Sequence, residues 1–128
     1  MHNKERRKYP RVPVYTPISY ICEDAEGNSL HQNMGVARNV SQAGIQIETI
    51  QMIKSKYILL MFVDLKKKQI ETRGEVVYCK NNESGKYITG IKLQGSEKDI
   101  LKFVGEIVRF YHYQKDTPRA IISPTIPN

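Results

Sequence analysis

The period of the apolar residues changes once along this chain, and that change limits what the chain can fold into. Before residue 95, six short runs show the alternation or the β-branched content of strands, and turn-forming residues separate them. From Ser96 onward the apolar residues recur at helical spacing. Strands joined by short turns pair with their neighbours, so the sequence predicts a mainly β fold: a small six-stranded antiparallel β-barrel with a C-terminal α-helix.

The six expected strands differ in how clearly they alternate. They occupy residues 16–22, 30–39, 44–49, 57–65, 69–80 and 87–93. The third is the clearest and should turn Ile45 and Ile47 inward. The second is weakly patterned, and its best register groups Met34, Val36 and Arg38 on one face.

Two glycines interrupt the last two expected strands. Gly74 suits a β-bulge or a sharp bend at a barrel corner. Gly90 marks a bend or a position that another part of the backbone approaches closely. Both are interpreted as features of the barrel rather than as site residues.

The stretch after Gly95 predicts a helix that packs on the barrel. Its apolar stripe consists of Ile100, Leu101, Val104, Ile107, Val108 and Tyr111. Phe103 and Phe110 lie off this stripe, so we expect them on the surface, where they would offer a second apolar contact. The sequence therefore favours a homodimer through this helix, or another protein docked on it.

The chain divides into four expected segments. Residues 1–14 form a flexible basic arm, 15–95 the barrel, 96–114 the helix and 115–128 an extended tail containing Pro118 and two further prolines. The longest apolar run is too short to span a membrane or to form the core of a secretory signal. We therefore expect a cytoplasmic protein without membrane insertion.

The formal charge of +7 is concentrated at the beginning of the chain. Residues 1–11 hold five Lys or Arg residues against Glu5 alone. Such a concentration argues for a local anion site rather than for a broad nucleic-acid footprint.

Residues typical of catalysis are missing from the pattern. The three histidines are scattered, and Cys22 and Cys79 stand alone, without the spacing that builds a metal site. No nucleophile elbow, Walker loop or dinucleotide-binding motif occurs. We therefore expect a protein that is not an enzyme and that needs neither a cofactor nor a metal.

The basic segment contains two arginines at a spacing of four, Arg7 and Arg11. Pro10 pushes Tyr9 towards extended geometry, which places Arg7, Tyr9 and Arg11 on one side of the chain. A guanidinium group binds phosphate oxygens and the O6/N7 edge of guanine in a bidentate manner. A solvated basic tail is the simpler alternative for this stretch alone.

A second informative stretch is the expected turn Asn39-x-Ser41-x-x-Gly44. Asn39 carries a donor and an acceptor, and Ser41 adds a hydroxyl group. Gly44 permits close approach or a positive φ angle. Such a turn is by itself more often a loop than a binding site.

The two stretches, in this order and followed by barrel strands and a helix, resemble the PilZ domain over roughly residues 5–113. PilZ domains are small β-barrel receptors for the bacterial second messenger cyclic di-GMP. The resemblance implies that Arg7 and Arg11 take guanine edges and phosphates, and that Asn39, Ser41 and Gly44 engage the other guanine. Arg6 adds a third cation, in a neighbourhood that bears on whether one ligand or a stacked pair is held.

The resulting hypothesis is a cyclic di-GMP receptor that signals to an unidentified downstream protein by ordering its N-terminal arm. Two alternatives stay open. One is a nucleic-acid-binding small β-barrel that uses the same basic arm, against which the sparse charge of the barrel counts. The other is a PilZ-like adaptor that acts through protein contacts and binds no nucleotide.

Overall fold

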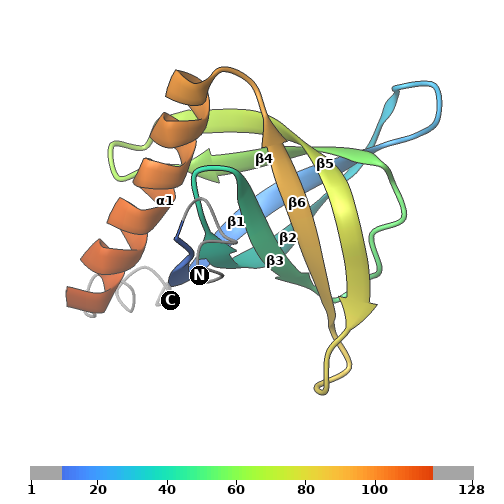
Figure 1. The fold of residues 1–128 in the computed structure, drawn as a ribbon, viewed down its shortest axis with the longest axis horizontal. Helices are drawn as coiled ribbons and strands as arrows, with labels where there is room; N and C mark the ends of the chain where they lie inside the picture. The colour runs from blue at the N-terminus through green and yellow to red at the C-terminus, as the bar shows by residue number, and fades with distance from the viewer. Residues whose placement is uncertain (1–9, 117–128) are drawn as a thin grey trace, which may run out of the picture.

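The computed structural model describes residues 10–116 and folds them into a closed β-barrel followed by one helix (Figure 1). The elements are β1 (Val12–Glu23), β2 (Ser29–Val40), β3 (Gly44–Thr49), β4 (Tyr57–Val63), β5 (Gln69–Asn81), β6 (Tyr87–Gln94) and α1 (Glu97–Asp116). The strands are antiparallel and follow one another around the barrel in the order β1-β2-β3-β6-β5-β4. The predicted six-stranded barrel with a C-terminal helix is confirmed.

The first strand begins earlier than the expected boundary at residue 15. Val12 pairs with Val40 and Pro13 with Asn39, so these residues belong to the barrel rather than to the arm. The two prolines of β1, Pro13 and Pro17, are tolerated because β4 pairs with β1 only from Ser19 onward. Before that point β1 has one paired edge, and a proline there need not donate to a second strand.

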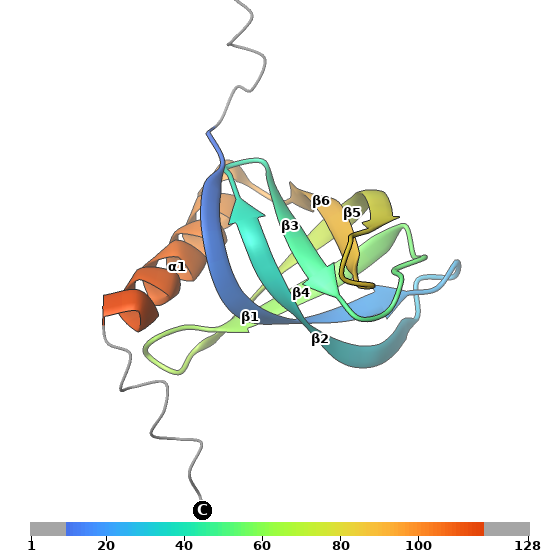
Figure 2. The same ribbon diagram turned by 90° about the horizontal axis from the view of Figure 1, so that it is seen from below.

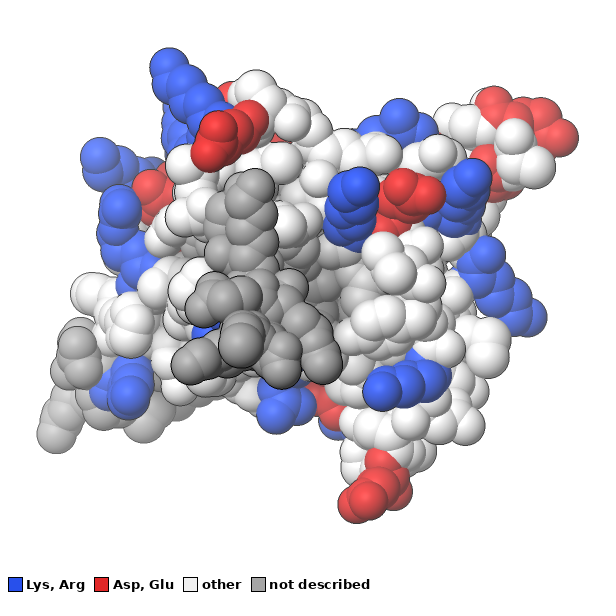
Figure 3. All heavy atoms as spheres, in the orientation of Figure 1, with Lys and Arg blue, Asp and Glu red and all other residues white. Residues whose placement is uncertain are grey.

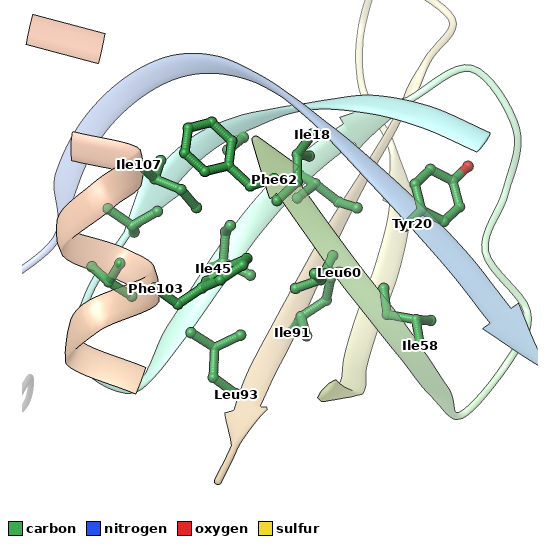
Figure 4. Close-up of a cluster of buried hydrophobic side chains, with 14 of the residues drawn as sticks. Ile18, Tyr20, Ile45, Ile58, Leu60, Phe62, Ile91, Leu93, Phe103 and Ile107 are labelled. Atoms are coloured by element: carbon green, nitrogen blue, oxygen red, sulfur yellow. The ribbon is translucent and has the colours of Figure 1, made fainter. Parts of the chain in front are cut away.

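The interior of the barrel is filled by alternate residues of the strands (Figure 4). Ile45 and Ile47 of β3 are buried, as the alternation predicts. Met34 and Val36 of β2 share one face, as the sequence predicts, but it is the outer face: Met34 is 61% exposed, whereas Ala37 and Val40 are buried. A bulge, described below, affects only the end of β2, where it lets Ala37 and Val40 both point inward although they are three residues apart.

Helix α1 lies along one side of the barrel, where it packs against β1 and β5 (Figures 1 and 2). Phe103, which we expected on the surface, is 2% exposed and points with Ile107 towards the barrel interior (Figure 4). The Phe110 ring meets Phe62 edge to face, with centroids 5.3 Å apart. Leu101 is instead 39% exposed. The expectation of two surface phenylalanines is therefore wrong. The homodimer through this helix was inferred from their exposure, so that argument for it no longer holds.

Of the two features expected at Gly74, a bulge or a sharp bend, the bulge lies elsewhere in β5. Gly74 pairs with Leu93 in regular register, and the irregularity falls between Val76 and Tyr78. Gly74 is nevertheless needed, because a Cβ atom there would collide with the Ile91 side chain.

Over the described part of the chain, no helix is both long enough and apolar enough to cross a membrane.

Candidate functional site

A hollow of about 360 Å³ lies on the outer surface of the barrel, over the end of β2 and the adjoining parts of β3, β6 and β5. Four residues singled out from the sequence line it: Arg11, Asn39, Ser41 and Gly44. Three more residues contribute polar, aromatic or charged groups: Gln46, Tyr78 and Lys92. Arg6 and Arg7 fall outside the described residues, so their part in the site stays a prediction.

Ser41 holds the turn between β2 and β3. Its backbone N–H donates to the Gly44 carbonyl at 2.9 Å, and its Oγ accepts from the N–H groups of Ala43 and Gly44, both at 3.2 Å. The Leu93 N–H donates to the Ala43 carbonyl at 3.0 Å and so ties the turn to β6. The Ser41 oxygen is therefore occupied by the turn, while its hydroxyl hydrogen can still donate to an acceptor in the hollow.

Gly44 is required by close approach rather than by an unusual backbone angle. It is not among the described glycines with positive φ, which are Gly27, Gly85 and Gly95. A Cβ atom at position 44 would instead lie 2.8 Å from the Ile91 carbonyl oxygen of β6. Both possibilities were open from the sequence, and the structure selects the first.

Asn39 reaches the outer surface because of a bulge at Arg38. Ala37 pairs with Ile47 and Asn39 with Gln46, so Arg38 is the extra residue on β2. In a regular strand without the bulge, Asn39 would point to the same face as Ala37, which is the core. The Asn39 Nδ2 donates to Gln46 Oε1 at 2.9 Å, and Gln46 Nε2 donates to the Tyr78 hydroxyl at 3.0 Å.

A second bulge, at Val77, acts in the same way on β5. Val76 pairs with Ile91 and Tyr78 with Gly90, which leaves Val77 as the extra residue. Tyr78 is consequently 41% exposed. Its ring lies over Gly90, where any Cβ atom would collide with it. The close approach predicted at Gly90 is therefore made by an aromatic ring and not by backbone.

The two bulges bring four residues into one row across the sheet. Asn39 of β2 pairs with Gln46 of β3, Gln46 with Gly90 of β6, and Gly90 with Tyr78 of β5. Because directly paired residues point to the same face, the three side chains of this row lie together on the outer surface. The hydrogen bond between Gln46 and Tyr78 passes over Gly90, which has no side chain.

The charge lining the hollow is positive. Arg11 and Lys92 both line it, and no Asp or Glu does so among residues 10–116. Lys92 was missed from the sequence because it lies on a strand far from the basic arm, and only its pairing with Gly44 brings it to the site. Such a lining suits an anionic ligand.

The neighbouring Arg38 is engaged away from the hollow. Its Nη1 donates to Glu48 Oε1 at 2.7 Å, and its guanidinium carbon lies 5.3 Å from the centre of the Tyr15 ring. Burial tends to raise the pKa of Glu48, but hydrogen bonds from Arg38 and Asn82 and the charges of Arg38 and Lys86 outweigh it. The pKa of Glu48 is therefore lowered from its ordinary value of 4.5. These contacts hold Arg38 on the outer surface of β2, outside the hollow.

Comparison with protein-family models identifies the family of the chain. The PilZ domain model matches residues 5–110, and the chain therefore belongs to the PilZ domain family, whose members are non-catalytic receptor domains for cyclic di-GMP. No curated protein matches the chain in sequence.

Three solved structures share the fold at low sequence identity. Bacillus subtilis MotI/DgrA, an inhibitor of motility, is 18% identical with a TM-score of 0.59, over 81% of this chain and 50% of that one. The PilZ domain of CeSA from a cellulose-synthesizing bacterium is 18% identical with a TM-score of 0.54, over 74% and 94%. The PilZ domain of Escherichia coli YcgR, solved with c-di-GMP, is 9% identical with a TM-score of 0.57, over 88% and 98%. The chain thus spans half the length of MotI/DgrA and nearly all of the other two.

Proposed function

We propose that this protein is a cytoplasmic cyclic di-GMP receptor that binds the dinucleotide in the hollow beside β2 and β3. One observation carries the proposal: Arg11 and the Asn39-x-Ser41-x-x-Gly44 turn, 28 residues apart in the sequence, line the same hollow in a member of the PilZ family. No residue of the hollow needs to perform chemistry for this function.

The chemistry of the hollow supports this ligand. Cyclic di-GMP carries two phosphates and two guanines, and Arg11 and Lys92 supply positive charge for the phosphates. Arg11 can also take the O6/N7 edge of a guanine. The exposed ring of Tyr78 offers a surface for stacking, which contributes about 1–3 kcal/mol per base where it occurs.

We propose further that Arg6 and Arg7 complete the site and that the ligand orders the arm that carries them. Ordering the arm over the hollow would change the surface offered to a downstream protein. This step accounts for how a domain without catalytic residues could pass on a signal.

The nucleic-acid alternative receives less support. A protein that tracks a phosphate backbone gathers Lys and Arg on one face. Figure 3 shows Lys and Arg side chains scattered over the face in view, with Asp and Glu among them. Together with the small size of the hollow, this distribution favours a compact anion.

Calorimetric titration with cyclic di-GMP tests the proposal. At about 100 µM protein, binding with a Kd of ~1 µM or weaker remains measurable. Arg11→Ala should weaken binding about 5- to 150-fold, the equivalent of about 1–3 kcal/mol for a bidentate Arg–guanine pair. Arg109→Ala is the matched control, because Arg109 lies on α1 and pairs with Glu106, away from the hollow.

The outcomes separate the three functions. No heat of binding from a folded wild-type protein would refute the receptor and favour the adaptor. Tighter binding of generic oligonucleotides than of cyclic di-GMP, with a steep salt dependence, would favour the nucleic-acid barrel. If Arg11→Ala and Arg109→Ala weaken cyclic di-GMP binding equally, Arg11 does not contact the ligand.

A further inference from the structure

We propose that Gln46 and Tyr78 are positioning residues that fix the side-chain amide of Asn39, so that its carbonyl oxygen faces the hollow and selects guanine. This inference rests on the proposed function and adds residues and a specificity to it. It comes from the row of paired residues across β2, β3, β6 and β5, and not from either sequence motif.

The hydrogen bonds of the row run in one direction. The Tyr78 hydroxyl accepts from Gln46 Nε2 at 3.0 Å, and Gln46 Oε1 lies on the side of β2. That oxygen accepts from Asn39 Nδ2 at 2.9 Å. A flipped Asn39 amide would set two carbonyl oxygens against each other and lose this bond. The Asn39 amide is therefore held by Gln46, and Gln46 is in turn held by the Tyr78 hydroxyl, three strands away from β2.

The contact between Tyr78 and Gln46 depends on Gly90. Tyr78 and Gln46 lie on strands that are separated by β6, and both pair with Gly90. Because Gly90 has no side chain, the Tyr78 ring can lie across β6 and bring its hydroxyl to Gln46. Any other residue at position 90 would push the ring away from the sheet and break the contact.

A fixed amide discriminates between purines. With Nδ2 held by Gln46, Asn39 offers the hollow its Oδ1, an acceptor. The Watson–Crick edge of guanine presents the donors N1–H and N2–H to such an oxygen, whereas adenine presents the N1 lone pair at the central position. An amide that is free to rotate would bind either base. Loss of the hydrogen bonds among Asn39, Gln46 and Tyr78 should therefore reduce the preference for guanine over adenine.

The experiment compares wild type, Gln46→Leu, Tyr78→Phe and the double variant by calorimetry with cyclic di-GMP, and by competition with cyclic di-AMP. Gln46→Leu removes both hydrogen bonds and should weaken cyclic di-GMP binding about 3- to 10-fold. Tyr78→Phe keeps the ring and should weaken it about 3-fold. Gln69→Leu is the matched control, because its exposed amide contacts Glu71 and lies away from the hollow.

The double variant gives the decisive readout. If Tyr78 acts through Gln46, the double variant binds no more weakly than Gln46→Leu, and the ratio of the cyclic di-GMP to the cyclic di-AMP affinity falls in all three variants. Effects that multiply, or a ratio equal to that of wild type, would overturn the positioning role and leave the receptor intact. Absence of cyclic di-GMP binding by folded wild-type protein would overturn the receptor itself, and the positioning role with it.

Discussion

Replacing Gly44 by alanine tests whether the glycine of the Asn39-x-Ser41-x-x-Gly44 turn serves the fold before it serves any ligand. The new Cβ atom would lie 2.8 Å from the Ile91 carbonyl oxygen, a distance that real Cβ atoms essentially never show. Both groups belong to paired backbones, so the strain cannot be relieved by rotating a side chain. Strands β3 and β6 would have to move apart at the point where Leu93 donates to Ala43.

The magnitude follows from two opposing terms. Overpacking of this kind costs about 1–3 kcal/mol. Alanine also restricts the unfolded chain, which returns about 0.4–1 kcal/mol. The net loss for Gly44→Ala should therefore be about 1.3 kcal/mol at the centre of these ranges and at most about 2.6 kcal/mol, or a fall in Tm of about 5 °C and at most about 10 °C for a domain of this size.

Gly105→Ala provides a control of opposite sign. Gly105 lies within α1, and a Cβ atom there would meet nothing within 4 Å. Alanine should stabilise the helix by about 0.5–1 kcal/mol. Calorimetric melting without ligand measures both variants. A Gly44→Ala protein that melts at or above the wild-type temperature would refute the close-approach argument and leave contact with the ligand as the reason for the glycine.

Two further predictions concern stability. Phe103→Ala should cost about 3–5 kcal/mol in urea unfolding because the ring is fully enclosed, whereas Leu101→Ala should cost less than about 1 kcal/mol; similar losses would contradict the described helix orientation. The pKa of Glu48 is lowered in the folded protein, so its contribution to stability is present above pH 4.5 and is lost as the pH falls through the folded pKa. Unfolding free energies measured between about pH 6 and pH 3 should therefore fall less steeply in Glu48→Gln than in wild type, and parallel curves would show that the contacts of Arg38 and Asn82 do not depend on this charge.

The fold could be predicted because the signals for it are local. Alternation in the strands, turn residues between them and a helical period after Ser96 each depend on a few neighbouring residues, and all point to the same architecture. Ile100, Val104 and Ile107 of the predicted helix stripe are buried as expected, and the prediction failed only for neighbouring apolar residues. Leu101 and Phe103 have similar hydrophobicity, and only docking against β1 and β5 decides which of them is buried.

The candidate site was predicted in part for the same reason. The turn from Asn39 to Gly44 is a local sequence, whereas Gln46, Tyr78 and Lys92 reach the hollow only through strand pairing. The signal that could have found Tyr78 was the glycine at position 90, a gap that an aromatic ring on a neighbouring strand can cover.

The sequence by itself determined the kinds of groups this protein can offer a ligand: arginines at a spacing of four, an amide, a hydroxyl and a glycine at a turn. The tertiary structure decided which of the described groups face the same way. Strict alternation would turn both Asn39 and Tyr78 into the barrel, and the bulges at Arg38 and Val77 turn both outward. A bulge depends on how two strands fit each other, since one extra residue on one strand has meaning only against the register of its partner. That information is distributed over paired strands, which is why the outer row of the hollow emerges only when the barrel is closed.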